Sequence, residues 1–277
     1  MIALRPVPPH PEPGVWAVLD RPSPLEEQTS VSVLDNPVWW ALAGPQRHLG
    51  TSTDRVVRFH PEISPFAAVP AAATDDDWLD LARMAGSGGQ LALVEEGEGA
   101  LRPGPGWSVE WELAGVQMVW EKSARARGVL PGPGPNGLRA SALQLESLGP
   151  DDVGEMLALV AVTRPGPFLA RTVEFGGYLG VRSGGRLIAM AGERMRPPGF
   201  AEVSAVATDP DHRRHGLGEF LVRSVAAGIV ERGETPFLHA ASSNVNAIRL
   251  YESIGFTVRR TVAFLLAKAP IVDPATS

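Results

Sequence analysis

The segment from Asp209 to Leu221, which reads DPDHRRHGLGEFL, constrains the fold of this chain more than any other. It follows a short apolar, β-prone run at 201–208 and precedes apolar residues at helical spacing, so the sequence predicts a strand, a glycine-rich turn and a helix. Gly216 and Gly218 lack a Cβ, which lets the backbone turn sharply and approach a ligand closely. The free amides of the helix's first turn and the two adjacent arginines would converge on one anion. The segment therefore predicts a phosphate-binding turn.

Two common phosphate-binding motifs do not fit this turn. A nucleotide-binding P-loop needs a lysine followed by serine or threonine after its glycines, and RRHGLG is followed by Glu219 and Phe220. A dinucleotide fingerprint needs a third glycine three residues after the second, where this chain has Leu221. The turn is thus predicted to bind another kind of phosphate-bearing ligand.

The second half of the chain alternates strand and helix patterns. Strands are expected at 138–145, 178–182, 186–193, 202–208, 236–241 and 256–268, and helices at 151–162, 217–233 and 246–254. A strand followed by a helix and another strand implies parallel pairing, whereas the tight turn at 183–185 implies a hairpin. We therefore expect an α/β fold of the α+β kind, with a mixed, mostly antiparallel sheet.

The first half gives weaker signals. Strands are expected at 16–19, 55–59, 90–94, 108–113 and 116–120. Thr74 and the three aspartates after it form a helix start, because a capping oxygen and first-turn negative charge both stabilise a helix N-terminus. That interpretation is preferred over a metal site, and no metal is expected. The tryptophans that favour this half are interpreted as packing residues.

Proline and glycine suggest where the chain divides. The run PGPGPNG at 131–137 is the best candidate for a linker among the 277 residues. We expect an N-terminal domain at 1–130, this linker, a second domain at 138–268 and a tail at 269–277.

Composition excludes several function classes. The formal net charge of -6 argues against broad attraction to nucleic acid, and the four basic or potentially basic residues of HRRH make only a small patch. The chain has no cysteine, which excludes disulfides, zinc–thiolate sites and a covalent cysteine intermediate. It contains no apolar run as long as a membrane span, so a soluble, cytoplasmic protein is expected, with no nucleic-acid or membrane partner.

Two motifs about thirty residues apart give the chain a family likeness. Arg213, Gly216 and Gly218 match the pattern of Arg or Gln, two residues, Gly, one residue, and Gly or Ala. The segment NVNAIRLYESIGF, Asn244–Phe256, matches Asn, two residues, Ala, two residues, Leu-Tyr, three residues and Gly-Phe. With both motifs, the chain resembles the GNAT superfamily of acyl-CoA-dependent N-acyltransferases, and the segments at 177–195 and 236–244 look most like its glycine N-acyltransferase branch. The likeness covers about 138–268 well and the first half only vaguely, so it implies a catalytic GNAT domain at 138–268 preceded by a divergent GNAT-like N-terminal half at 1–130.

The resemblance implies a splayed pair of parallel strands that admits acetyl-CoA, and it assigns residues to that cosubstrate. Asn244 would hydrogen-bond the pantetheine arm, Tyr251 would protonate the leaving thiolate, and a main-chain amide near Val206 would polarise the thioester carbonyl. The full set of cofactor residues is Val206, Ala207, Thr208, Arg213, Arg214, His215, Gly216, Leu217, Gly218, Asn244, Asn246 and Tyr251.

An amine acceptor must lose a proton before it attacks, so a general base or a water path is needed. Glu202 is the preferred base because it begins the strand that leads into the glycine turn, and a solvated carboxylate is the alternative. Glu193 and Glu174 are weaker candidates. The histidines His212, His215 and His239 are interpreted as structural or loop residues. The segment RPGPF at 164–168 is either a wall of the acceptor pocket or an ordinary connection.

These features predict an N-acetyltransferase that passes an acetyl or other short acyl group from acetyl-CoA directly to a primary amine, without a covalent enzyme intermediate. The expected acceptor is a small-molecule amine or an amino acid, with a peptide N-terminus as a further option. A CoA-binding sensor or interaction module that lacks catalysis is the alternative.

Overall fold

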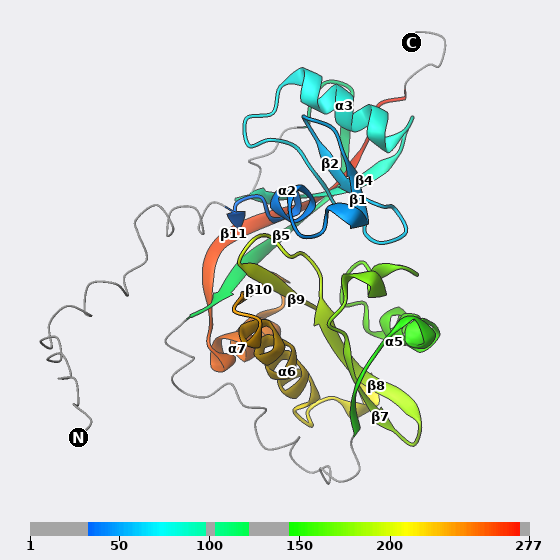
Figure 1. Cartoon of the computed structure of the whole chain (residues 1–277), viewed down its shortest axis with the longest axis vertical. Helices are drawn as coiled ribbons and strands as arrows, with labels where there is room; N and C mark the ends of the chain where they lie inside the picture. Colours follow the sequence, from blue (N-terminus) through cyan, green and yellow to red (C-terminus); the bar gives the residue numbers. More distant parts are fainter. Residues whose placement is uncertain (1–32, 98–102, 122–143, 272–277) are drawn as a thin grey trace, which may run out of the picture.

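The computed structural model describes residues 33–97, 103–121 and 144–271 (Figure 1). Its strands are β1 Gly50–Ser52, β2 Val57–Phe59, β3 Ala67–Ala68, β4 Gln90–Glu96, β5 Ser108–Trp120, β6 Gln144–Ser147, β7 Leu179–Ser183, β8 Arg186–Glu193, β9 Phe200–Thr208, β10 Thr235–Ala241 and β11 Phe256–Lys268. Its α-helices are α2 Pro37–Ala43, α3 Asp75–Ala85, α5 Val153–Thr163, α6 Leu217–Glu231 and α7 Val245–Ile254. No helix in these ranges is both long and apolar enough to span a bilayer.

Eight strands form one sheet in the order β4-β11-β5-β10-β9-β8-β7-β6. Neighbours pair antiparallel except for β9 and β10, which pair in parallel over three residue pairs from Phe200 with Thr235 to Glu202 with Phe237. Beyond Glu202 the two strands diverge. The predicted α+β fold, with a mostly antiparallel sheet and a splayed parallel pair, is therefore confirmed.

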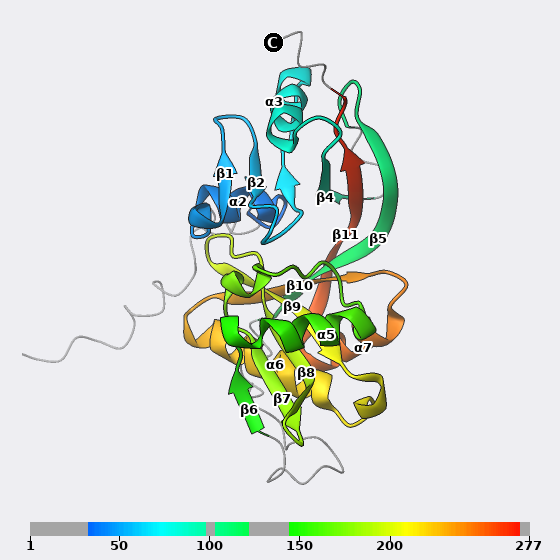
Figure 2. The ribbon, with the colours of Figure 1, turned by 90° about the vertical axis from the view of Figure 1, so that its right-hand side faces the viewer.

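The strand β5 comes from the first half of the chain but lies between two strands of the second half. It pairs with β10 from Gly115 to Val119 and with β11 along nearly its whole length. Figure 2 shows β5 and β11 running together from the lower to the upper part of the molecule. Gly115 permits this close approach, because a Cβ there would lie 2.6 Å from the Phe264 ring and 2.9 Å from the Ala240 carbonyl oxygen. The two strands expected at 108–113 and 116–120 are thus one, and the sheet continues across the expected domain division.

Helices cover both faces of the sheet around the glycine turn. On one face, the apolar side of α6 packs with α7, as the predicted spacing of Leu217, Leu221, Val225 and Ile229 requires, and all four are buried. On the other face, Met156 and Leu159 of α5 pack with residues of β8 and β9. The sheet is therefore held between two layers where β9 and β10 separate (Figure 1).

In its described residues, the first half adds a small three-stranded sheet, β1-β2-β3, and the helices α2 and α3. The predicted helix start at Thr74 is confirmed: its hydroxyl caps Asp77, and the Asp77 carboxylate accepts the Thr74 amide in return. The strand expected at 55–59 is confirmed as β2, whereas α2, β1 and β3 were not predicted. A core that contains Val38, Phe59 and Phe237 joins this half to the large sheet.

Several predicted features fall outside the described residues. These are the linker at 131–137, the strand at 16–19 and the first part of the strand expected at 138–145. The packing role predicted for the tryptophans holds for Trp120, which is 3% exposed, but Trp111 is 48% exposed.

Candidate active site

The glycine-rich turn leads from β9 into α6 as predicted. Gly216 has φ of 81° and is the N-cap of α6, and Arg214 has φ of 65°, so two residues of the turn adopt the left-handed conformation. The first amides of α6 have no intrahelical acceptor, as at any helix N-terminus. A Cβ on Gly218 would meet nothing closer than the Thr208 Oγ1 at 3.9 Å, so the protein leaves the surface above this residue open. The turn thus presents amide donors to a space that an anion could reach.

The splay of the sheet opens a pocket of about 790 Å³ beside this turn. Ala205, with φ of 53°, interrupts the regular register between β8 and β9 and bends β9 at the point where the pairing with β10 has ended. Residues 203–208 of β9 consequently line the pocket. Such a strand edge can offer backbone amides to a ligand in place of a neighbouring strand.

The structure brings together part of the predicted cofactor set. Seven members line the pocket: Val206, Ala207, Thr208, Arg213, Asn244, Asn246 and Tyr251. The other five, Arg214, His215, Gly216, Leu217 and Gly218, form the turn that continues from Arg213 into α6 and do not line the pocket itself. Leu217 is buried in the core below α6, so only its backbone is available to a ligand.

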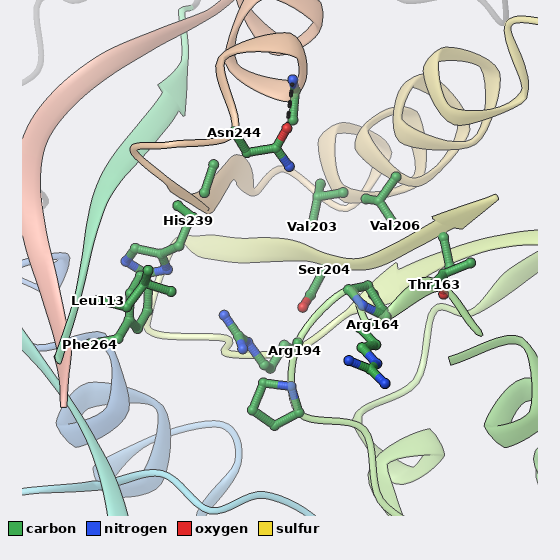
Figure 3. Close-up of a pocket in the computed structure, with 18 of the residues that line it drawn as sticks. Leu113, Thr163, Arg164, Arg194, Val203, Ser204, Val206, His239, Asn244 and Phe264 are labelled. Atoms are coloured by element: carbon green, nitrogen blue, oxygen red, sulfur yellow. Dashed lines mark hydrogen bonds between the residues drawn. The ribbon is translucent and has the colours of Figure 1, made fainter. Parts of the chain in front are cut away.

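Tyr251 and Asn244 lie on the α7 side of the pocket. The Tyr251 side chain packs against Phe256 and is almost fully buried, and burial raises the pKa of its phenol to about 12. The hydroxyl is therefore protonated at neutral pH and can act only as a donor of its proton. Asn244 caps α7 by accepting the Ala247 amide at 3.2 Å, as the dashed line in Figure 3 shows.

The predicted base Glu202 is not placed to act directly. It is fully buried at the start of β9 and is absent from the pocket lining. Arg194 donates to both carboxylate oxygens, with Nε at 2.8 Å and Nη2 at 2.6 Å. The neighbouring Arg194 and His239 hold the pKa of Glu202 at about 2 despite the opposing effect of burial. A carboxylate with so low a pKa is a poor proton acceptor, so the structure argues against a direct base role.

A buried hydrogen-bonded row extends from Glu202 across the sheet. The Nδ1 of His239 lies 2.7 Å from the carboxylate, and its Nε2 lies 3.2 Å from the amide nitrogen of Gln117 on β5. That nitrogen also donates to the carbonyl oxygen of Leu34. Both ring nitrogens of His239 therefore have partners, and the structural interpretation of this histidine agrees with its geometry, although its ring also lines the pocket.

The two weaker candidates for the base are also ion-paired. The Nη2 of Arg232 lies 2.7 Å from a carboxylate oxygen of Glu193. On the surface, Arg171 donates hydrogen bonds to both carboxylate oxygens of Glu174. Neither glutamate lines the pocket.

The wall opposite the glycine turn comes largely from residues that the sequence did not single out. Arg194 stands at the centre of this wall, with its guanidinium 4.9 Å from the centre of the Phe66 ring. Strands β5 and β11 supply Trp111, Leu113 and Phe264. Figure 3 shows Arg194, His239 and Ser204 around the same space as Leu113 and Phe264. In the sequence, only the alternation of Val109, Trp111 and Leu113 with polar residues could have indicated this wall, because it places the three apolar side chains on one face of a strand.

The segment RPGPF forms another side of the pocket. Arg164 ends α5 in the left-handed conformation with φ of 49°, and residues 163–167 line the cavity. Of the two interpretations of this segment, the geometry thus favours a pocket wall. Phe168 turns away and packs in the core below α5.

Apart from Tyr251, the ionisable side chains that line the pocket are all basic. They are Arg164, Arg194, Arg213 and His239, and the lining contains no aspartate or glutamate. Within the described ranges, no three or more histidine, cysteine or acidic residues are grouped so that they could hold a metal ion. The pocket therefore favours ligands with anionic groups over bare cations.

Comparisons with known proteins agree with this architecture. A model of the FR47-like protein family matches residues 178–265, from β7 into β11. The solved structure of a GNAT-family protein from Novosphingobium aromaticivorans is 40% identical to this chain with a TM-score of 0.71, and the match covers 87% of this chain and 99% of that one.

Curated relatives match shorter segments. The N-alpha-acetyltransferase RimI of Mycobacterium tuberculosis is 37% identical over 82 residues, which are 28% of this chain and 51% of that protein. The ribosomal protein bS18-alanine N-acetyltransferase of Escherichia coli is 44% identical over 59 residues, which are 20% of this chain and 40% of that protein. This chain thus spans about half or less of the length of these two relatives.

Proposed function

Because this chain belongs to the GNAT family, we propose that it is an N-acetyltransferase that transfers an acetyl group from acetyl-CoA to a primary amine by direct attack. The observation that carries the proposal is the pocket in which the splayed β9, the glycine turn and Tyr251 meet. The relatives support acetyl transfer in general, and the acceptor and the mechanism are part of the proposal.

The residues present fit acetyl-CoA. The N-terminus of the 15-residue helix α6 and Arg213 supply donors and positive charge for a pyrophosphate, and the open surface above Gly218 leaves room for it. The stretch of β9 that no longer pairs with β10 and the side chain of Asn246 line the same pocket as Arg213 and Tyr251. When bound, acetyl-CoA supplies an activated thioester, which an amine can attack without a covalent enzyme intermediate.

Two groups of the protein would then assist the transfer. A backbone amide of β9 near Val206 is proposed to donate a hydrogen bond to the carbonyl oxygen on which negative charge develops. Tyr251 is proposed to give its proton to the sulfur as the carbon–sulfur bond breaks. Its pKa of about 12 keeps it protonated until that moment.

Glu202 is proposed to act through Arg194 rather than on the amine. Its carboxylate holds the guanidinium by two hydrogen bonds and so fixes the wall against which the acceptor lies. The amine would lose its proton to water, and the cationic lining favours this loss because nearby positive charge disfavours an ammonium group.

The narrower likeness to the glycine N-acyltransferase branch remains a proposal, which the cationic lining supports. The RimI relatives suggest a peptide N-terminus as the other acceptor. A CoA-binding module without catalysis is the rival function. It would bind acetyl-CoA but release no CoA with any amine, whereas the retained Tyr251 at the pocket favours an enzyme.

The test of this proposal is the Tyr251→Phe variant. Removing the hydroxyl takes away the proposed proton donor, so kcat should fall about 100-fold while the dissociation constant for acetyl-CoA stays within about twofold. The other tyrosine of the chain, Tyr178, is buried below α5 outside the pocket lining and provides a matched control. Tyr178→Phe should keep its turnover. Full turnover of Tyr251→Phe at saturating substrates would remove Tyr251 from the mechanism.

A further inference from the structure

The pocket wall formed by Arg194, Trp111, Leu113 and Phe264, here called the acceptor side, contains an arginine whose guanidinium is held in place but still has hydrogen-bond donors with no acceptor among the described residues. The Arg194 side chain is only 11% exposed, and Glu202 holds its Nε and Nη2. Its Nη1 has no hydrogen-bond partner in the part of the chain that the structure describes. A guanidinium whose plane is fixed in this way is ready to donate to a further anion at little entropic cost.

The charge of the lining determines which groups can approach this arginine. Buried Glu202, which lies outside the pocket lining, neutralises the charge of Arg194. Arg164 also lines the pocket and has no ion-pair partner in the described residues. Because the lining contains no carboxylate, a substrate with several ammonium groups would meet only like charge. An acceptor that carries a carboxylate near its amine would instead find two arginines.

The remaining surface of the acceptor side is apolar. Trp111 is 48% exposed and Leu113 is 40% exposed, and both lie on the pocket wall with Phe264. Large apolar side chains exposed in a cavity gain free energy when a ligand covers them, by about 25 cal/mol for each Å² removed from water. Figure 3 shows Leu113 and Phe264 close to His239 and on the same side of the cavity as Arg194.

From these observations we propose that the acceptor is an α-amino acid with an aromatic or branched apolar side chain, whose carboxylate binds Arg194 and Arg164 and whose side chain lies on Trp111, Leu113 and Phe264. The inference rests on the proposed acetyltransferase function. In the reaction, the ammonium group first loses one proton to water, and its nitrogen then bonds to the acetyl carbon while the carbon–sulfur bond breaks. Tyr251 protonates the sulfur, which leaves as CoA thiol, and the second proton lost by the nitrogen returns to Tyr251 through water. The peptide N-terminus and simple amines are the alternatives that the test separates.

The experiment compares three acceptors of similar size: L-phenylalanine, L-phenylalaninamide and phenethylamine. The amide has a neutral group in place of the carboxylate, and phenethylamine has none. CoA release is measured with a thiol reagent, to which this chain contributes nothing because it has no cysteine. The expected kcat/KM for L-phenylalanine exceeds that for either comparison amine at least tenfold. Equal or better use of the amide or of phenethylamine would overturn the inference.

Variants identify the arginines. Arg164→Ala should raise KM for L-phenylalanine about tenfold and raise KM for phenethylamine much less, because phenethylamine has no carboxylate for Arg164 to bind. Arg194→Lys keeps a positive charge beside buried Glu202, so it should fold, but it should lose at least tenfold in kcat/KM with L-phenylalanine because the planar third nitrogen is gone. Arg83→Ala, on the exposed side of α3 outside the pocket, is the matched control and should change nothing. An equal loss with all three acceptors in Arg164→Ala would contradict carboxylate binding.

Calorimetric binding to the CoA complex separates this inference from the proposed function. L-phenylalanine should bind in the presence of CoA, and Arg164→Ala should weaken that binding about tenfold. Binding of this kind without CoA release from any amine would support the inference and refute the enzyme. Turnover with phenethylamine but no binding of L-phenylalanine would do the reverse.

Discussion

At the residue scale, the sequence predicts where Glu202 lies in its strand but not which side chains it contacts. Its position at the start of the strand before the glycine turn was predictable from strand periodicity. Its partners were not, because Arg194 is on the preceding connection and His239 is 37 residues away on β10. The antiparallel return from β8 to β9 brings Arg194 to Glu202, and the parallel pairing of β9 with β10 brings His239 there. The resulting ion pair changes a predicted base into a group that positions Arg194.

The buried ion pair makes stability depend on pH. The Glu202 pKa of about 2 lies below the value of about 4.3 for an unfolded glutamate, so its ionised form stabilises the fold above about pH 5. That stabilisation, on the order of 3 kcal/mol, should be lost as the pH falls from about 5 towards 2. Urea unfolding at several pH values measures it.

The Glu202→Gln variant tests the same pair. It leaves the Arg194 charge buried without its counter-ion and should lower the free energy of unfolding at pH 7 by about 3–5 kcal/mol. Its loss of stability between pH 5 and 2 should be smaller than that of the wild type by the part due to Glu202, whereas Asp77, Glu174 and Asp209, whose pKa values are also lowered, still contribute. Glu231→Gln, on the exposed end of α6, is the control that should alter neither. An unchanged unfolding curve in Glu202→Gln would mean that the pair contributes nothing.

At the element scale, the start of α6 was the best predicted part of the molecule. A glycine in a left-handed turn, an apolar stripe and a preceding strand are local properties, and local properties are what a sequence displays most directly. The acceptor wall was missed for the opposite reason. Its members lie on β5, on β11 and, in the case of Arg194, on the connection between β8 and β9, and these segments meet only through the sheet order.

The two glycines of the turn should respond differently to the same substitution. Gly216 has φ of 81°, so Gly216→Val should cost about 1–2 kcal/mol of stability and distort the turn. The Cβ of valine at Gly218 would have only ordinary contacts at 3.9 Å and beyond. Gly218→Val should therefore keep its melting temperature within about 3 °C of wild type but bind acetyl-CoA at least tenfold more weakly. Calorimetric titration beside thermal denaturation checks this, and wild-type affinity in Gly218→Val would place the pyrophosphate elsewhere.

At the scale of the whole molecule, the position of β5 was not predictable. Its strand character was evident, but a strand of the first half could equally have completed a sheet of its own. The topology instead places it between β10 and β11, where Met118 and Trp120 contribute to the core beneath α6 and α7. The proposed division at 131–137 therefore separates two parts of the sequence, but the strands of both parts belong to one sheet.

Cleavage of the chain tests this arrangement. A protease site inserted at 131–137 and then cut should yield two fragments that elute together in gel filtration, because β5 pairs with strands on both sides. Separation should need denaturant, and the cut protein should still bind acetyl-CoA. Uncut protein carrying the same insertion is the control. Fragments that separate in native buffer would show that the halves fold independently.

The order of the sheet also bears on how the chain is made. The strands β4 and β5 flank β11, which follows every other described strand along the chain. During synthesis, β4 and β5 lack the strand that will lie between them until β11 has been made. The apolar residues of β4 that contact Leu265 in the folded protein stay exposed until then. A ribosome stalled before residue 256 would thus carry a nascent chain with exposed strand edges, which is the state that chaperones recognise and in which aggregation begins.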